Sequence, residues 1–158
     1  MKYEVIVIGG GPGGLSAAIY TARYNLKTLL ISLDMGGTML DAHIVENYPS
    51  YNSIKGEELM KRFEDHAKSL GVELKIGEVK SIEKTKDGFK VKADREYESK
   101  TLILATGSKH RMLNVKGEKE FSGKGVSYCY TCDAPFFKNK DKVIIVGGGD
   151  SASQGSLL

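Results

Sequence analysis

The sequence predicts an α/β fold built on a Rossmann-like domain. A short apolar, β-branched run at residues 3–8 leads directly into a glycine turn at residues 9–14. Small, helix-compatible residues follow at 15–24, and a second apolar run occupies 28–31. Apolar runs of this length are typical of parallel strands buried on both faces. Their alternation with a helix therefore predicts a mostly parallel sheet covered by helices.

The first glycine turn has the spacing of a dinucleotide-binding loop. Gly9, Gly11 and Gly14 fit the pattern G-x-G-x-x-G between a predicted strand and a predicted helix. The first glycine permits a tight turn, the second lets the backbone approach a pyrophosphate, and the third lets the helix pack on the strand. Asp34 lies about twenty residues after Gly14, where a ribose-binding carboxylate is expected. A solvated turn residue is the alternative interpretation of Asp34.

The segment between residues 33 and 104 supplies further elements of this domain. Residues 33–54 form a long segment without periodicity, and loops of this length inside a compact domain are usually functional. Residues 56–70 predict an amphipathic helix that ends at Gly71. Alternation from Val72 to Tyr97, with a hairpin turn at Asp87-Gly88, predicts a small antiparallel insertion laid over the main sheet. A buried strand at residues 101–104 returns to that sheet.

A second domain is predicted to begin after a polar connection near residues 116–121. We therefore assign residues 1–115 to the first domain and 116–158 to the start of another. Residues 142–146 predict a buried strand that enters a second glycine turn at 147–149. A Rossmann half needs a helix and at least one more strand after such a turn. Since only residues 153–158 follow, we expect a piece of a longer protein or a split gene.

The two cysteines, Cys129 and Cys132, form a C-x-x-C pair between the two glycine turns. In a chain without a recognisable secretion signal, such a pair is more often redox-active or metal-binding than structural. The three histidines show no paired ligand spacing, which disfavours a zinc site with its four ligands. The C-x-x-C spacing also disfavours a pair of inert buried thiols. A redox-active disulfide is the prediction, and no metal is expected.

Composition excludes several classes of protein. Hydrophobic residues make up 41% of the 158 residues and charged residues 27%, a balance typical of globular proteins. No apolar run approaches the roughly 20 residues that span a bilayer. The net charge of +3 is small and both signs are interspersed, so neither nucleic acid nor a membrane is expected as a partner.

These motifs together resemble the low-molecular-weight thioredoxin reductase family of flavoprotein disulfide reductases. The resemblance extends over nearly the whole chain. It rests on the glycine turn ending the run 5–14, the segment Val45-Glu46-Asn47-Tyr48-Pro49, the triplet Ala105-Thr106-Gly107, the stretch 125–133 around the cysteines, and the turn 147–152. We call residues 125–133 the redox box. Its distance from both glycine turns is the most specific feature.

The resemblance implies two cofactors, FAD and NADPH. FAD is expected at Gly9, Gly11, Pro12, Gly13, Gly14, Asp34, Gly36, Gly37, Asn47, Ala105, Thr106 and Gly107. NADPH is expected at Gly147, Gly149, Asp150 and Ser151.

The resemblance also assigns roles within the redox box. Cys132 would face the flavin, Cys129 would attack a partner disulfide, and Asp133 would act as acid or base. A helix-capping role is the alternative for Asp133. The expected partner is a thioredoxin- or glutaredoxin-like protein, and the full-length protein is expected to be a cytoplasmic homodimer.

The chain departs from the family pattern at several positions. Thr38 and Met39 follow Gly36-Gly37, where the family usually has a glutamine that contacts the flavin. Tyr130 and Ala134 replace a usual alanine and glycine, and both add bulk beside the cysteines. Three alternatives remain. The chain could be a flavin-binding half that is inactive alone, a reductase with another electron donor, or a ferredoxin-NADP-reductase-like flavoprotein, which shares the glycine turns but does not need the dithiol.

Overall fold

The computed structural model describes residues 2–157, which fold into two compact units. Residues 2–44 and 54–109 form unit 1, and residues 45–53 and 110–157 form unit 2. The sequence-based boundary lies a few residues later, between 115 and 116. Unit 1 contains all the named strands of the described chain.

Unit 1 is built on one six-stranded sheet with the order β3-β2-β1-β6-β5-β4. The strands are β1 (Lys2–Ile8), β2 (Thr28–Ser32), β3 (Glu73–Ile76), β4 (Ser81–Thr85), β5 (Gly88–Lys92) and β6 (Glu96–Leu104). The four strands β3, β2, β1 and β6 pair in parallel, whereas β5 pairs antiparallel with both β6 and β4. The predicted α/β class, a mostly parallel sheet with an antiparallel insertion, is confirmed.

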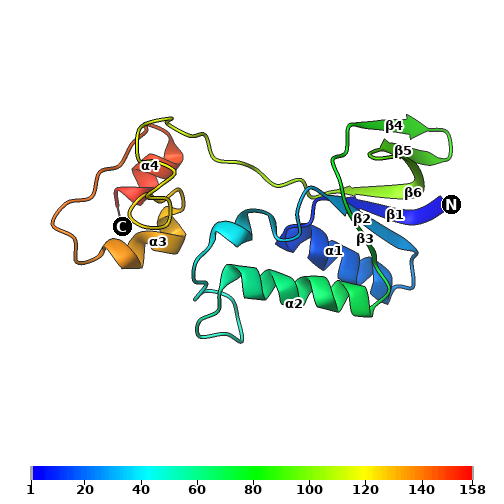
Figure 1. The fold of residues 1–158 in the computed structure, drawn as a ribbon, viewed down its shortest axis with the longest axis horizontal. Coiled ribbons are helices and arrows are strands. Elements are labelled where there is room, and N and C mark those ends of the chain that lie inside the picture. The colour runs from blue at the N-terminus through cyan, green and yellow to red at the C-terminus, as the bar shows by residue number, and fades with distance from the viewer. Residues whose placement is uncertain (1, 158) are drawn as a thin grey trace. The chain divides into compact units, whose positions relative to one another are not determined.

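Two helices cover one side of the parallel strands (Figure 1). They are α1 (Pro12–Arg23) and α2 (Gly56–Ser69), while a short 3₁₀ helix, η1 (Gly37–Asp41), lies between them in the chain. The predicted apolar stripe of α2 is confirmed, since Leu59, Met60 and Ala67 are buried and His66 is exposed. Leu15 and Ala18 of α1, Leu30 of β2 and Ala67 belong to one buried cluster. This cluster attaches the helices to the sheet.

The antiparallel hairpin of β4 and β5 lies on the other side of the parallel strands (Figure 1). Strand β6 makes this possible because Glu98 and Ser99 pair with β1 on one edge and with β5 on the other. Val91 and Tyr97 thereby join Ile6 and Leu29 in a second buried cluster.

The sequence analysis was wrong about the start of the insertion. Residues 72–76 alternate like the hairpin strands, but β3 pairs in parallel with β2 and belongs to the main sheet. Alternation reports that a strand has one covered face and one exposed face. An edge strand of a parallel sheet meets that condition as well as a hairpin strand does.

Unit 2 contains α3 (Tyr130–Phe137) and α4 (Asp150–Gly155). The buried strand predicted at residues 142–146 is not observed, and Val143 to Val146 are between 45% and 77% exposed. A strand buried on both faces needs neighbouring strands to satisfy its backbone and helices to cover it. Residues 110–157 contain no strand that could pair with this run.

Tyr3 on β1 generates a pH-dependent prediction. Burial, together with the hydrogen bond that the Tyr3 hydroxyl donates to Glu73 (2.7 Å), raises the pKa of Tyr3 to about 12. An unfolded tyrosine ionises near about pH 10, so the unfolded chain releases this proton at lower pH than the folded chain. The contribution of Tyr3 to stability is therefore complete below about pH 10 and is lost as the pH rises toward 12. We expect Tyr3→Phe to lose less stability over that range, measured by urea unfolding at each pH.

Tyr24→Phe is the matched control for this experiment, because the Tyr24 side chain is 75% exposed. This variant should follow the parent chain at every pH. An equally steep loss of stability in Tyr3→Phe would contradict the prediction.

Candidate functional site

The first glycine turn joins the end of β1 to the start of α1 in a space that excludes side chains. Gly9 has φ +110°, and its N–H donates to the Ile31 carbonyl (2.9 Å). A Cβ atom on Gly9 would lie 2.1 Å from the Ala105 oxygen, and one on Gly14 would lie 1.8 Å from the Gly9 oxygen. Both contacts are with backbone, which cannot move aside. The turn therefore requires glycine at these two positions.

A second loop, residues 34–37, packs on the first glycine turn. The Gly36 N–H donates to the Gly10 carbonyl (2.8 Å), and the Gly37 N–H donates to a carboxylate oxygen of Asp34 (2.8 Å). A Cβ atom on Gly37 would lie 3.3 Å from the Gly11 Cα. Asp34 is exposed and stabilises this turn through one of its oxygens. The bond agrees with the turn role considered for Asp34, and the ribose role stays a prediction.

The third loop, Ala105-Thr106-Gly107, follows β6. The Ala105 N–H donates to the Ile8 carbonyl (2.8 Å), which holds this loop beside the first turn. Thr106 and Gly107 are exposed, and Gly107 has φ +69°. We call the loops 9–14, 34–37 and 105–107 the glycine cradle. It lies at the carboxyl ends of β1, β2 and β6, where open α/β sheets bind their ligands.

The glycine cradle has the features that a dinucleotide pyrophosphate requires. Gly11 is the N-cap residue of α1, Pro12 is its first residue, and no acidic residue lies in the first turn. A Cβ atom on Gly13 would have no neighbouring atom within 4 Å, so the outer side of this turn is open. A helix N-terminus beside an open glycine turn favours negatively charged phosphates. Asn47, also predicted for this site, belongs to unit 2 and is exposed.

The redox box contains a disulfide between Cys129 and Cys132. The sulfur atoms are 2.08 Å apart and the Cα atoms 5.2 Å apart. Cys129 is the N-cap residue of α3, and its sulfur accepts a hydrogen bond from the Cys132 N–H (3.2 Å). The Thr131 hydroxyl lies 3.4 Å from the same sulfur. A helix N-terminus and an N–H donor both favour a thiolate at Cys129 once the bond is reduced.

Asp133 lies in the first turn of α3, directly after Cys132. Its carboxylate accepts a hydrogen bond from the Ser127 hydroxyl. The same hydroxyl oxygen accepts from the Cys129 N–H (3.1 Å). The N-cap position is occupied by Cys129, not by Asp133. Ser127 therefore connects the acid to the backbone of the first cysteine.

The second glycine turn belongs to the same unit as the redox box. Gly147 has φ +129°, Gly149 is the N-cap residue of α4, and Asp150 and Ser151 begin that helix. The Tyr130 hydroxyl donates to the side-chain oxygen of Gln154 on α4. A Cβ atom on Gly155 would lie 3.1 Å from the Tyr130 Cβ. The bulk that Tyr130 adds to the redox box is thus used in packing α3 against α4.

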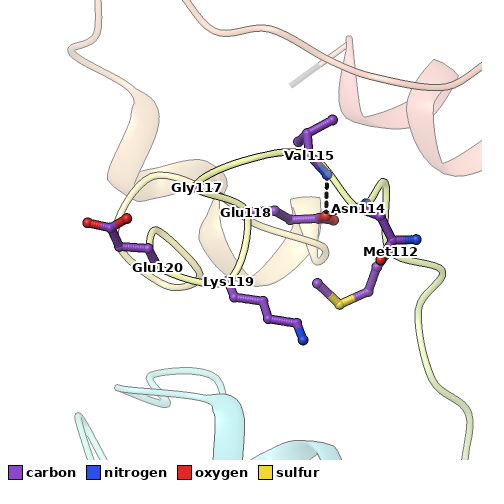
Figure 2. A pocket seen from close by; sticks show the side chains of 7 residues that line it. All are labelled: Met112, Asn114, Val115, Gly117, Glu118, Lys119 and Glu120. Carbon is purple, nitrogen blue, oxygen red and sulfur yellow. Dashed lines mark hydrogen bonds between the residues drawn. The ribbon is translucent and has the colours of Figure 1, made fainter.

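Sequence reasoning assigned no role to four polar side chains that organise these sites. Ser32 accepts a hydrogen bond from the Gly10 N–H (2.8 Å) and so supports the first glycine turn. Ser127 and Tyr128 belong to the redox box, and Glu118 contacts it through the Tyr128 hydroxyl. Glu118 also lines an open pocket of about 360 Å³ (Figure 2). Neither strand nor helix periodicity marks these residues, because all four lie in loops or at a strand end.

The spacing of the histidines disfavoured a metal site, and the lack of a long apolar run disfavoured a membrane-spanning segment. Within residues 2–157, no three or more His, Cys, Asp or Glu side chains are grouped so that they could hold a metal ion. None of the helices in the same range is long and apolar enough to cross a membrane.

Comparison with known proteins agrees with this geometry. The model of the pyridine nucleotide-disulphide oxidoreductase family matches residues 3–156. The chain belongs to this family. Membership of this family makes the chain part of an oxidoreductase.

Individual relatives are thioredoxin reductases. The chain is 47% identical over 152 residues to thioredoxin reductase from Bacillus subtilis (strain 168), covering 95% of this chain and 48% of that protein. The crystal structure of thioredoxin reductase from Streptococcus pyogenes MGAS5005 matches with a TM-score of 0.93 and 42% identity, covering 99% of this chain and 51% of that one. A ferredoxin-flavin thioredoxin reductase from Clostridium acetobutylicum matches with a TM-score of 0.65 and 36% identity, covering 98% and 54%. The predicted resemblance is confirmed, and the chain spans about half the length of the curated relatives it matches.

The two glycines of the cradle generate a matched prediction. Gly14→Ala should lower the stability of the chain by about 1–3 kcal/mol, because its Cβ would overlap the Gly9 carbonyl and force the backbone to shift. Gly13→Ala should change stability by less than about 0.5 kcal/mol, since its Cβ would enter open space. Thermal unfolding followed by circular dichroism measures both. Equal losses in the two variants would contradict the close packing described at Gly14.

Proposed function

We propose that this chain supplies the FAD-binding part and the dithiol-bearing part of an NADPH-dependent thioredoxin-disulfide reductase. The observation that carries the proposal is the disulfide at the N-terminus of α3, in the same chain as the glycine cradle. Residues 1–115 would form the FAD-binding domain. Residues 116–158 would begin the nucleotide domain that carries the redox box.

The glycine cradle is the proposed FAD site. Its pyrophosphate would meet the backbone of the first glycine turn and the N-terminus of α1, where the outer side of the turn is open. The residues proposed to hold FAD are Gly9, Gly11, Pro12, Gly13, Gly14, Asp34, Gly36, Gly37, Asn47, Ala105, Thr106 and Gly107. Those proposed to hold NADPH are Gly147, Gly149, Asp150 and Ser151. Bound FAD would supply the electron pair that reduces the disulfide.

The cysteines would then carry out thiol–disulfide exchange. The Cys129 thiolate attacks one sulfur of the partner disulfide, forming a mixed disulfide and releasing one partner thiolate. The Cys132 thiolate next attacks the Cys129 sulfur, which restores the Cys129–Cys132 disulfide and releases the second partner thiolate. Two electrons thereby pass from the dithiol to the partner, and two protons complete its thiols. The Cys132 N–H, 3.2 Å from the Cys129 sulfur, supports the thiolate that begins this sequence.

Asp133 is the proposed acid or base for these protons. It follows Cys132 directly, and the Ser127 hydroxyl hydrogen-bonded to its carboxylate also contacts the Cys129 backbone. A carboxylate held at this position can accept a proton when a thiol becomes a thiolate and return it later.

The proposed partner is a thioredoxin- or glutaredoxin-like protein, because the relatives of this chain carry the name thioredoxin reductase. We propose that the full-length protein acts in the cytoplasm as a homodimer.

A second candidate function is a flavin-binding half that needs another polypeptide for activity. The observation in its favour is that the chain spans about half the length of its curated relatives. A reductase with another electron donor is a variant of the main proposal, consistent with the name of the Clostridium acetobutylicum relative, a ferredoxin-flavin thioredoxin reductase.

An absorption spectrum separates these candidates. We expect the purified chain, incubated with FAD and passed over a desalting column, to retain a flavin band that NADPH bleaches under anaerobic conditions. A retained band that NADPH does not bleach would favour the second candidate or another donor. No retained band would contradict the proposal that the glycine cradle of this chain holds FAD without a further polypeptide.

Single cysteine variants test the proposed order of attack. In reduced Cys132→Ser, the Cys129 thiolate should form a mixed disulfide with an oxidised bacterial thioredoxin that no second thiol resolves. In reduced Cys129→Ser no such adduct should accumulate, since Cys132 is assigned to the flavin side. Non-reducing electrophoresis detects the adduct, and the double serine variant is the control. An adduct with Cys129→Ser alone would reverse the assignment.

A further inference from the structure

Glu118 is the one residue of the described stretch 110–157 that is buried, with 4% of its surface exposed. A buried carboxylate is costly unless hydrogen bonds replace its water. The ordinary occupant of such a position is an apolar side chain. A charged residue with so little exposed surface therefore calls for an explanation.

Three backbone N–H groups donate hydrogen bonds to the Glu118 carboxylate and replace water around it. Leu113, Asn114 and Val115 donate to it at 2.8, 2.6 and 3.3 Å. Figure 2 shows the side chain turned inward toward Asn114 and Val115, with the bond to Val115 dashed. Asn114 has φ +59° and Gly117 has φ +88°, so this loop folds back tightly around the carboxylate. Glu118 thus closes its own loop.

The fourth donor comes from the redox box. The hydroxyl of Tyr128 donates a hydrogen bond to the Glu118 carboxylate. This bond lowers the pKa of Glu118 most, the three backbone bonds lower it further, and burial acts in the opposite direction. The face of the Tyr128 ring is also in contact, because the His110 ring stacks on it with ring centres 3.6 Å apart and an angle of 15° between the planes. Tyr128 is therefore fixed at its hydroxyl and at its face.

In the chain, Tyr128 lies between Ser127, which contacts Asp133, and Cys129, which is part of the disulfide. Ser127, before it, bonds both the Asp133 carboxylate and the Cys129 N–H. Cys129, after it, is the N-cap residue of α3. Fixing the Tyr128 side chain restrains the backbone on both sides, and with it the direction in which Ser127 presents its hydroxyl to Asp133.

We propose that Glu118 is a positioning residue for the redox box: through Tyr128 it holds Ser127 against Asp133 and so keeps the Asp133 carboxylate beside the cysteines. Glu118 touches no reacting atom in this arrangement. The inference rests on the proposed function only in the role that it gives Asp133, and it adds a residue that the sequence motif does not include.

The pH dependence of thiol alkylation tests this proposal without cofactor or partner. The chain is reduced, freed of reductant, and treated with iodoacetamide over a range of pH, and mass spectrometry gives the rate at each cysteine. A nearby carboxylate disfavours a thiolate, so Asp133→Asn should lower the thiol pKa and speed alkylation at pH 7 about three- to tenfold. Tyr128→Phe, which frees Asp133 to move away, should shift the profile in the same direction by a smaller amount.

The double variant distinguishes positioning from a general structural effect. If Tyr128 acts through Asp133, Tyr128→Phe should add nothing further in the Asp133→Asn background. Tyr128→Phe leaves the three backbone bonds of Glu118 in place, so the loop should still fold. Glu118→Gln, which removes the charge, should reproduce the Tyr128→Phe shift if it folds. Tyr24→Phe, an exposed tyrosine of unit 1, is the control and should leave the profile unchanged.

Three outcomes would overturn the proposal. The first is an unchanged profile in Tyr128→Phe, and the second is an equal shift with and without Asp133→Asn. The third is an unchanged profile in Asp133→Asn, which would also reject the role proposed for Asp133. None of these results would bear on the proposed FAD binding or the proposed disulfide exchange. The absorption spectrum and the trapped adduct test those two proposals separately.

Discussion

The backbone contact at Gly9 and Gly14 is the constraint on which unit 1 depends. At these two positions the end of β1, the start of α1 and the loop after β6 approach so closely that no Cβ fits. This approach brings the three loops of the glycine cradle to one edge of the sheet. The hydrogen bonds from Gly36 to Gly10 and from Ala105 to Ile8 complete the arrangement. A side chain at either glycine would separate the strand from the helix and open the site.

Unit 2 is organised differently. It has no buried apolar side chain between residues 110 and 157, and its one buried residue there is Glu118. Polar side chains take over the organising role: Glu118 closes a loop and holds Tyr128, and Ser127 joins Asp133 to Cys129. Hydrogen bonds are directional and individually modest. Such a network suits a site in which an acid and two sulfur atoms must keep a defined relation.

Sequence reasoning succeeded where local rules and tertiary packing agree. The strands 3–8 and 28–31 were predicted from apolar runs, and the helix at 56–70 from an apolar stripe of helical period. The predicted hairpin is present, but its two turn residues are Lys86 and Asp87, because Gly88 begins β5 and pairs with Thr85. Sequence reasoning failed at residues 142–146, where an apolar run looks like a buried strand but lies exposed without a strand beside it. It also placed 72–76 in the hairpin, because alternation cannot tell which neighbour a strand will have.

The sequence by itself determined the α/β class, the two glycine turns, the C-x-x-C pair and the family that these motifs indicate. Each of these depends on residues close together in the chain, where steric rules for glycine and the spacing of cysteines act directly. Only the tertiary structure decided that Asp34 stabilises the turn at Gly37, that Tyr130 packs on α4, and that Glu118 reaches Tyr128. These contacts join loops whose meeting depends on the folded path of the chain, and no local pattern encodes that path.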